Sequence, residues 1–491
     1  MLSTEKIAEE NVKLKQRVKL LEEYIRLQNQ KQFGASSEKD TGGQGQLFNE
    51  AEDIVDAESS DDSAAVNVPG YTRKKKNRLS IPEDLPCEDV IHDLPEHEKF
   101  CPHDGTALKC IGEESHKQLD IEPATIKVLR HLRKKYACPC CEKHLMTASK
   151  PPQPIEKSIA APGLLAYITV SKYLDALPLY RQVAIFKRIG VELDRTTLAN
   201  WMIKMGALVQ PLINRLQEIA TEQNVLHMDE TPLQVLNEPG KSAQSKSYMW
   251  VVATQASVPI VLYHYSPGRS GDTPKDLLAD FNGALMTDGY EGYNAACVEN
   301  NLTRLGCWAH ARRKFIDAQR QQPKGKSGKA DMALGFIQKL YAIEKNSNDK
   351  TTDERYKIRQ TQSRAVIEKL RQWLEKTLQN TPPKTTLGKA VHYLHNQWPR
   401  LIAYLEDGHW PMDNNRAENT IRPFVIGRKN WLFANSQAGA RASANLYSLI
   451  ETAKANGLEP YAYLKKLFTL LPQAECLKDI DALLPWEEAK K

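Results

Sequence analysis

Two stretches, Val225-Leu226-His227-Met228-Asp229 and Ala284-Leu285-Met286-Thr287-Asp288, carry most of the information about the fold. Each is an apolar run of strand length that ends in a carboxylate. Two further β-rich runs, at 248–254 and 259–265, lie between them, and the loop 266–272 lacks the ending of a phosphate-binding P-loop. The pattern predicts a sheet with an Asp at the end of each of two strands.

Paired carboxylates at strand ends suit divalent metal binding. Magnesium prefers hard oxygen ligands and few of them. Two ions roughly 3.5–4 Å apart stabilise both the attacking and the leaving oxygen of an in-line phosphoryl displacement. Our candidate for a third carboxylate is Glu418, because Asp413 is a good N-cap and Asn415, Glu418, Asn419 and Arg422 share one helical face. A carboxylate at a strand end is more often a turn former, so spacing alone leaves this triad a hypothesis.

Length and charge indicate several domains and a soluble protein. The 491 residues are too many for one core, and the net charge of +6 is too mild to name a partner. Residues 40–62 contain acidic residues and no Lys or Arg, and 73–78 then reads Arg-Lys-Lys-Lys-Asn-Arg. This predicts an acidic linker and a basic arm that contacts phosphate; the alternative is a solvated charge run.

The N-terminal segment has the pattern of a short coiled coil. Ile7, Leu14 and Leu21 form one heptad series, and Asn11, Val18 and Ile25 form the other. The pattern predicts a homo-oligomer through this segment; the alternative is an amphipathic helix docked on its own protein. We find no signal peptide and no apolar run of roughly 18 residues, so we expect a cytoplasmic protein with no membrane partner and reduced cysteines.

The cysteines suggest a zinc site with one incomplete half. Cys138 and Cys141 have the spacing of a zinc knuckle, whereas Cys101 is followed three residues later by Asp104. The fourth ligand could be Asp104, His103 or Cys110. The alternative is a zinc-ribbon-like fold that keeps reduced cysteines without a metal.

Helices are predicted from about residue 163. An amphipathic helix at 179–187, a break at Gly190, an N-cap at Asp194 and a helix at 196–202 have the form of a helix-turn-helix. A plain helical hairpin is the alternative. Six residues could contact DNA phosphates, or could be solvated charges: His310, Arg312, Arg313, Lys314, Arg428 and Lys429. For the neighbouring Trp431 we favour core packing over base stacking.

Several blocks resemble one known family in the family's own order. They include His227-Met228-Asp229-Glu230-Thr231-Pro232, Thr287-Asp288-Gly289-Tyr290, Cys307-Trp308-Ala309-His310, Asp413-Asn414-Asn415-Arg416-Ala417-Glu418 and Gly427-Arg428-Lys429-Asn430-Trp431. The chain resembles the large transposase subunit of the insertion sequence 66 family over nearly its whole length. One departure is Asp104, where that family usually has a Cys, which puts the zinc in doubt.

The resemblance implies a multidomain α/β protein with a ribonuclease H-like catalytic core, a mixed sheet flanked by helices. Asp229, Asp288 and Glu418 would be its Asp-Asp-Glu triad, with Mg²⁺ or Mn²⁺ as cofactor beside the structural Zn²⁺. The activity would be 3′-end cleavage and strand transfer of an insertion sequence, with transposon ends, target DNA and companion proteins of the element as partners. The rivals are a ribonuclease H-like nuclease without strand transfer and a non-catalytic DNA-binding regulator.

Together these patterns predict eight regions. They are a coiled coil (1–32), an acidic linker and basic arm (33–80), a zinc-finger-like domain (81–150), a helix-turn-helix-like region (155–215), the first part of the catalytic core (222–315), a helical insertion (316–405), the helix of Glu418 (406–435) and a C-terminal helical extension (436–491).

Overall fold

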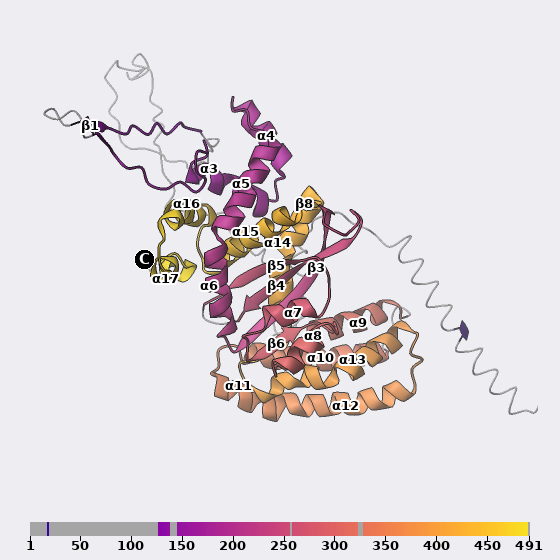
Figure 1. Ribbon diagram of the computed structural model, residues 1–491. Coiled ribbons are helices and arrows are strands. Elements are labelled where there is room, and N and C mark those ends of the chain that lie inside the picture. The colour runs from indigo at the N-terminus through magenta and orange to yellow at the C-terminus, as the bar shows by residue number, and fades with distance from the viewer. Residues whose placement is uncertain (1–16, 19–125, 138–144, 256–257, 323–327, 490–491) are drawn as a thin grey trace, which may run out of the picture. The chain divides into compact units, whose positions relative to one another are not determined.

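The computed structural model describes residues 17–18, 126–137, 145–255, 258–322 and 328–489 (Figure 1). The coiled coil except residues 17–18, the acidic linker, the basic arm and the predicted zinc ligands Cys101, Asp104, Cys138 and Cys141 lie outside the described residues. The chain forms two compact units, and residues 63–147 are one of them. That unit contributes an antiparallel pair of strands, β1 (Lys135–Ala137) and β2 (Leu145–Thr147).

A mixed sheet forms the centre of the second unit, in the order β5-β4-β3-β6-β7. β3 is antiparallel to β4, and β4 is antiparallel to β5, whereas β6 is parallel to both β3 and β7. A short strand, β8, pairs with the far end of β3. The strands are β3 (Val225–Asn237), β4 (Lys246–Thr254), β5 (Val261–Ser266), β6 (Ala284–Thr287), β7 (Thr303–Gly306) and β8 (Ala434–Ser436).

The prediction that the first strand ends at Asp229 is wrong, because β3 continues to Asn237. Beyond Asp229 the antiparallel ladder with β4 goes on to the pair Gln234–Lys246. In that second half, buried Leu233 and Val235 alternate with an exposed Gln234, the period expected of a strand with one solvated face. Asp229 therefore lies within a long strand, whereas Asp288 directly follows a short one.

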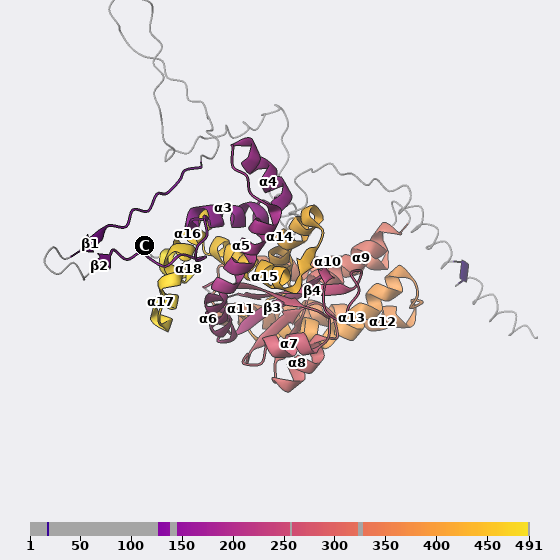
Figure 2. The same cartoon turned by 45° about the horizontal axis from the view of Figure 1, so that its top comes forward.

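Helices cover both faces of this sheet. Tyr263 of β5 packs against Phe424 of one helix layer, and Trp250 of β4 packs edge-on against Tyr293 on the other face, with ring centroids 6.2 and 5.8 Å apart. The first layer includes the two helices closest to the sheet, α14 and α15, as Figures 1 and 2 show. The helices of that side are α3 (Pro162–Tyr173), α4 (Leu179–Arg188), α5 (Arg195–Leu208), α6 (Gln210–Thr221), α14 (Asn415–Trp431), α15 (Gln437–Ala455) and α16 (Pro460–Leu470).

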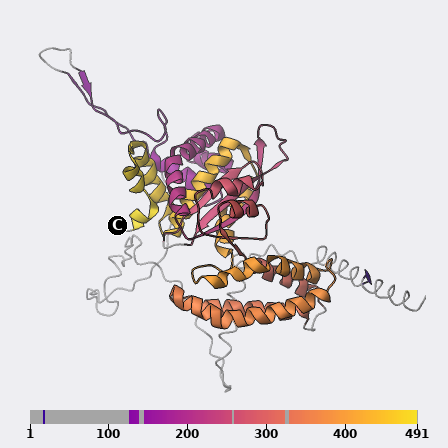
Figure 3. The same cartoon turned by 60° about the horizontal axis from the view of Figure 1, so that its bottom comes forward.

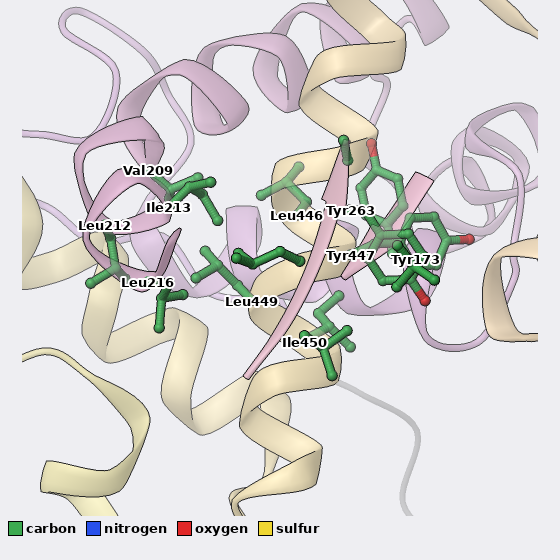
Figure 4. Close-up of a cluster of buried hydrophobic side chains, with 14 of the residues drawn as sticks. Tyr173, Val209, Leu212, Ile213, Leu216, Tyr263, Leu446, Tyr447, Leu449 and Ile450 are labelled. Carbon is green, nitrogen blue, oxygen red and sulfur yellow. The ribbon is translucent and has the colours of Figure 1, made fainter. Parts of the chain in front are cut away.

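The helix α15 organises the main core. Its Leu446 and Leu449 lie beside apolar side chains of α6, and its Tyr447 lies beside Tyr173 and Tyr263 (Figure 4). All of these side chains are buried. Their burial explains why a helix from the C-terminal part of the chain is fixed to elements that lie far earlier in the sequence.

Two side chains of α15 also cover the edge of the sheet. Ser448 Oγ accepts the backbone N–H of Tyr263 at 2.7 Å, and Thr452 Oγ1 lies 3.0 and 2.9 Å from the N–H and carbonyl of Val261. β5 is the last strand on this side of the sheet order, so its outward backbone groups need partners. The hydroxyl groups supply them and protect the edge from pairing with another chain.

A second core lies in the helices between β7 and α14. It contains Trp308, Phe315, Leu370 and Leu394, all fully buried. In Figures 1 and 3 these helices form a separate layer beside the sheet. They are α9 (Trp308–Arg320), α10 (Lys329–Asn346), α11 (Thr352–Ile358), the π-helix η2 (Arg359–Ser363), α12 (Arg364–Gln379), α13 (Thr386–Ile402) and the 3-10 helix η3 (Ala403–Glu406).

The remaining helices are short. They are α7 (Asp272–Leu277), α8 (Tyr293–Glu299), the 3-10 helix η4 (Leu471–Gln473), α17 (Leu477–Asp481) and α18 (Pro485–Ala489). Within the described residues, no helix combines the length and the apolar character that crossing a membrane requires.

The close crossing of α5 and α15 yields a stability prediction. A Cβ atom on Gly206 would lie 2.5 Å from the Cα of Ala442, which is shorter than any ordinary contact. We expect Gly206→Ala to lower the free energy of unfolding by about 1–3 kcal/mol, because the helices must move apart. As a control, Gly335→Ala on α10 meets nothing within 4 Å and should raise stability by up to about 1 kcal/mol. Chemical denaturation measures both, and equal effects would contradict the close crossing.

Candidate active site

The register of two parallel strands brings Asp229 and Asp288 together. His227 of β3 lies opposite Met286 of β6. Each Asp follows that pair by two residues, so both side chains project from the same face of the sheet. Neighbouring strands are about 4.8 Å apart, which places the two carboxylates side by side.

Local hydrogen bonds orient both carboxylates. Asp229 Oδ1 accepts the backbone N–H of Glu230 at 2.9 Å, and Asp288 Oδ1 accepts that of Tyr290 at 2.8 Å. Arg304 of β7 donates to the carbonyl oxygens of Asp288 and Tyr290 at 3.0 and 2.6 Å. The turn after β6 is therefore held from the neighbouring strand.

Glu418 lies in the first turn of α14 and is 3% exposed. The predicted N-cap was Asp413, but the structure places the N-cap at Asn414, one residue later. Asp413 instead accepts the N–H of Asn415 at 3.1 Å, so its carboxylate still satisfies the start of the helix. The positive end of the helix dipole favours a carboxylate at the position of Glu418.

Asn414 ties this helix to the strand that carries Asp229. Its Nδ2 donates to the carbonyl of Met228 at 2.8 Å, and its Oδ1 lies 3.1 Å from Nδ1 of His227. Its backbone N–H points at Cys307 Sγ, 3.2 Å away. Asn414 is fully buried and thus joins three elements of the site. We did not single out its role from the sequence, although its place four residues before Glu418 was a signal.

Two side chains of α9 converge on Glu418. Arg313 Nη2 lies 3.0 Å from Oε2, and His310 Nδ1 lies 3.2 Å from Oε1. The second contact does not have hydrogen-bond geometry, and among the described residues neither His310 Nδ1 nor Glu418 Oε1 has a hydrogen-bond partner. We predicted both basic residues as phosphate contacts; in the structure they face a carboxylate of the triad.

The other residues predicted to contact DNA have different neighbours in the structure. Lys314 Nζ lies 4.7 Å from the centroid of the Tyr393 ring. Arg428 donates to Thr231 Oγ1 at 3.0 Å and to the carbonyl of Pro232. Lys429 is exposed near the end of α14, and Arg312 lies on α9 beside Arg313.

Trp431 is partly buried in the main core. Its ring packs edge-on against Phe424, with ring centroids 5.4 Å apart. This agrees with the predicted core packing.

A neighbouring polar cluster was missed by sequence reasoning. Glu230, next to Asp229, accepts hydrogen bonds from Tyr293 Oη at 2.5 Å and from Arg269 Nε at 2.8 Å. The Arg269 guanidinium also lies 3.8 Å from the centroid of the Tyr290 ring. These partners neutralise and orient Glu230, so we do not count it among the carboxylates that would hold a metal. The only sequence signal was its position beside Asp229.

Each of the other carboxylates acts on the charge of Asp229. Burial raises the pKa of Asp229 well above its ordinary value, and the charges of Glu230, Glu418 and Asp288 raise it further. Burial also raises the pKa of Glu418, against the opposing effect of Arg313. Burial and the charge of Arg313 lower the pKa of His310 to about 4, so its ring is neutral at pH 7.

The donor set fits a divalent cation. It offers carboxylate oxygens, which Mg²⁺ prefers, and one of them, Glu418 Oε1, is buried without a hydrogen-bond partner among the described residues. Mutual repulsion between the three carboxylates would be relieved by positive charge placed among them. Asp229, Asp288 and Glu418 are the residues that would hold it.

The buried amide of Asn414 leads to a prediction about stability. Asn414→Ala leaves the Met228 carbonyl and His227 without this partner, and we expect a loss of about 1–3 kcal/mol in the free energy of unfolding. Lys429→Ala, at an exposed position on the same helix, should change it by less than about 0.5 kcal/mol. Urea denaturation compares the two variants. An equally small loss in both would show that Asn414 does not join these elements.

The carboxylate cluster predicts a pH-dependent response to Mg²⁺. The pKa of Asp229 is raised on folding, so above about pH 3.8 the folded state binds more protons than the unfolded chain. The stability of the metal-free protein should therefore fall as pH rises. Because Mg²⁺ binds the deprotonated carboxylates, the rise in Tm that it causes should be larger at pH 8 than at pH 5.

Asp229→Asn is the matched variant for this experiment. It removes one repelling charge, so its metal-free Tm at pH 8 should exceed that of the unaltered protein, and Mg²⁺ should shift it much less. Thermal melts with and without Mg²⁺ at the two pH values measure the effect. An undiminished Mg²⁺ shift in the variant would rule out Asp229 as a ligand.

Comparison with known proteins assigns the chain to a family. A family model described as Transposase IS66 family matches residues 157–442, and one described as IS66 C-terminal element matches 448–486. The zinc-finger binding domain of transposase IS66 matches 98–142, and Transposase C of IS166 homeodomain matches 20–90. The match at 98–142 covers the predicted zinc ligands, all of which lie outside the described residues.

Relatives match over most of their length. The uncharacterized protein y4qI of Sinorhizobium fredii (strain NBRC 101917 / NGR234) is 35% identical over 412 residues, which are 81% of this chain and 75% of that protein. The uncharacterized protein y4jD of the same strain is 33% identical over 438 residues, 87% of this chain and 84% of that protein. With a family model that spans more than half of the sequence, the chain belongs to the IS66 transposase family.

Proposed function

We propose that this chain is an Asp-Asp-Glu DNA transposase that cleaves the 3′ ends of its insertion sequence and joins them to target DNA. The observation that carries the proposal is the convergence of Asp229, Asp288 and Glu418 from β3, the end of β6 and α14. The family membership supports it, as does the mixed sheet with helices on both faces, which we take to be ribonuclease H-like.

The three carboxylates have separate roles in this proposal. The charges of both Asp288 and Glu418 act on Asp229, which supports Asp229 as the residue that would be shared by two metal ions. Two Mg²⁺ ions, or Mn²⁺, would supply charge stabilisation at the attacking and leaving oxygens. Arg313 binds Oε2 of Glu418, so Oε1 is the oxygen that would contact a metal ion. No covalent protein–DNA intermediate is required.

Positive side chains around the site would grip the DNA backbone. We assign four residues to phosphate contacts: Arg312, Lys314, Arg428 and Lys429. His310 and Arg313 contact Glu418 and would therefore lie near the scissile phosphate. The polyanionic backbone makes such contacts strongly salt-dependent. The helices α4 and α5, joined by a turn with Gly190 at φ +83°, would form a helix-turn-helix.

The remaining regions have proposed roles as well. The zinc-finger segment would hold structural Zn²⁺ with Cys101, Cys138 and Cys141, with Asp104 as the fourth ligand in place of a Cys. The coiled coil would make the protein a homo-oligomer, and companion proteins of the element would take part. The eight regions given above remain our proposed division of the chain.

A cleavage assay with the full chain tests the proposal. The substrate is DNA that carries the element's own ends, with Mg²⁺ present. We expect Asp229→Asn to bind these ends normally but to cut them at least roughly a hundredfold more slowly, because a ligand of the catalytic ions is lost. The control Asp280→Asn removes an exposed carboxylate and should cut at the normal rate.

The outcomes separate the rival functions. Unchanged activity of Asp229→Asn would contradict the catalytic triad, and failure of the unaltered chain to cut would favour a DNA-binding regulator. Supplying pre-cut ends and a target plasmid tests joining. Cleavage without any joined product would favour a nuclease.

A further inference from the structure

A second set of possible metal ligands lies beside the triad and includes only one of its members. The Sγ atom of Cys307, a ring nitrogen of His310 and a carboxylate oxygen of Glu418 all lie within 4.8 Å of one another. Cys307 is 1% exposed and Glu418 is 3% exposed, whereas the His310 side chain is 26% exposed. The thiol and the carboxylate are therefore buried, whereas part of the His310 ring reaches solvent.

Two of these three ligand atoms lack hydrogen bonds. His310 Nδ1 and Glu418 Oε1 lie 3.2 Å apart and are both buried, and neither finds a partner among the described residues. Buried polar atoms in a folded protein are normally paired with protein atoms, with water or with an ion. Two such atoms at one point, next to a thiol, indicate that a cation belongs between them.

The local chain geometry suits metal coordination. Cys307 is the N-cap of α9 and His310 lies in the first turn of that helix, so the two side chains are one turn apart on the same face. The backbone N–H of Asn414 points at Sγ from 3.2 Å, the kind of outer contact that orients a metal ligand and stabilises a thiolate. Arg313 fixes the other oxygen of Glu418.

We propose that Cys307, His310 and Glu418 form a binding site for a thiophilic divalent cation, Zn²⁺, that shares only Glu418 with the Asp-Asp-Glu triad. The chemistry of the donors selects the ion. Sulfur, imidazole nitrogen and one carboxylate oxygen are the ligands that zinc takes, whereas the triad offers only oxygen and suits Mg²⁺. Three protein ligands would leave one position of a four-coordinate zinc for a further ligand.

Sharing Glu418 makes the two sites compete. A zinc ion held by Cys307 and His310 engages Glu418 Oε1, which then cannot serve ions bound by Asp229 and Asp288. Zn²⁺ therefore inhibits the Mg²⁺-dependent reaction. This consequence, unlike the binding itself, rests on the proposed function.

Metal binding to the full chain tests the site directly. Co²⁺ serves as the probe, because a thiolate bound to Co²⁺ gives a charge-transfer absorption that a carboxylate does not. The variant is Cys307→Ser: serine is a favoured N-cap, so the start of α9 is kept while the thiolate is lost. Cys297→Ser is the control, because Cys297 is a buried cysteine outside the cluster.

The proposed zinc-finger cysteines would bind Co²⁺ as well, so all proteins are compared in a background with Cys138→Ser and Cys141→Ser. We expect Cys307→Ser to bind one equivalent of Co²⁺ fewer and to lose the corresponding thiolate absorption, and Cys297→Ser to lose neither. His310→Ala should lower the affinity for Co²⁺, followed by the same absorption band, by tenfold or more. Equal stoichiometry and equal absorption in Cys307→Ser and its parent would overturn the proposal.

A second measurement tests the competition. The Zn²⁺ concentration that halves the Mg²⁺-dependent cleavage rate should be at least tenfold higher for Cys307→Ser than for the unaltered chain, each relative to its own rate without zinc. Equal inhibition of both would refute the competition. Absence of any Mg²⁺-dependent cleavage by the unaltered chain would instead count against the proposed function, and the Co²⁺ result would stand by itself.

Discussion

The mutual repulsion of three carboxylates in a poorly solvated place is the constraint on which the site depends. Asp229, Asp288 and Glu418 come from elements far apart in the sequence, and burial together with neighbouring carboxylates raises the pKa of Asp229 and of Glu418. The fold imposes their meeting. The parallel register of β3 and β6 sets the first two, and the amide of Asn414 fixes the start of the helix that carries the third.

The same constraint explains the basic residues around Glu418. Arg313 offsets part of the charge, while the neutral ring of His310 adds none at pH 7. Burial, together with the charges of Glu230, Glu418 and Asp288, still holds the pKa of Asp229 well above its ordinary value. A site of this kind stores unfavourable energy that a bound cation releases, which is a common feature of functional sites.

Some of this arrangement could be predicted from the sequence. Asp229 and Asp288 were identifiable because each closes an apolar run, and Glu418 because it lies at the centre of a polar helical face. The full length of β3 was not, since the ladder with β4 continues past Asp229 through residues whose pattern looks like a turn. Nor was the pairing of His310 and Arg313 with Glu418 predictable. More than a hundred residues separate them, and a basic run carries no signal of which acid it meets.

The packing of α15 against the sheet shows the same limit. Its apolar residues predict a buried helix, but its Ser448 and Thr452 bond to the edge strand β5 nearly two hundred residues earlier. A Ser or Thr in a helix does not by itself indicate which distant strand its hydroxyl group will bond. Tertiary partners of polar side chains are thus the part of the structure that periodicity cannot supply.

The central claim is that Asp229, Asp288 and Glu418 share divalent ions. A crystal structure of the full chain with Mn²⁺, located by its anomalous scattering, tests this most directly. The account predicts anomalous peaks among these three side chains, with at least one ion contacted by Asp229 and a second carboxylate of the triad. Bound Mn²⁺ that contacts none of the three, or carboxylates that remain apart with Mn²⁺ held elsewhere, would contradict it.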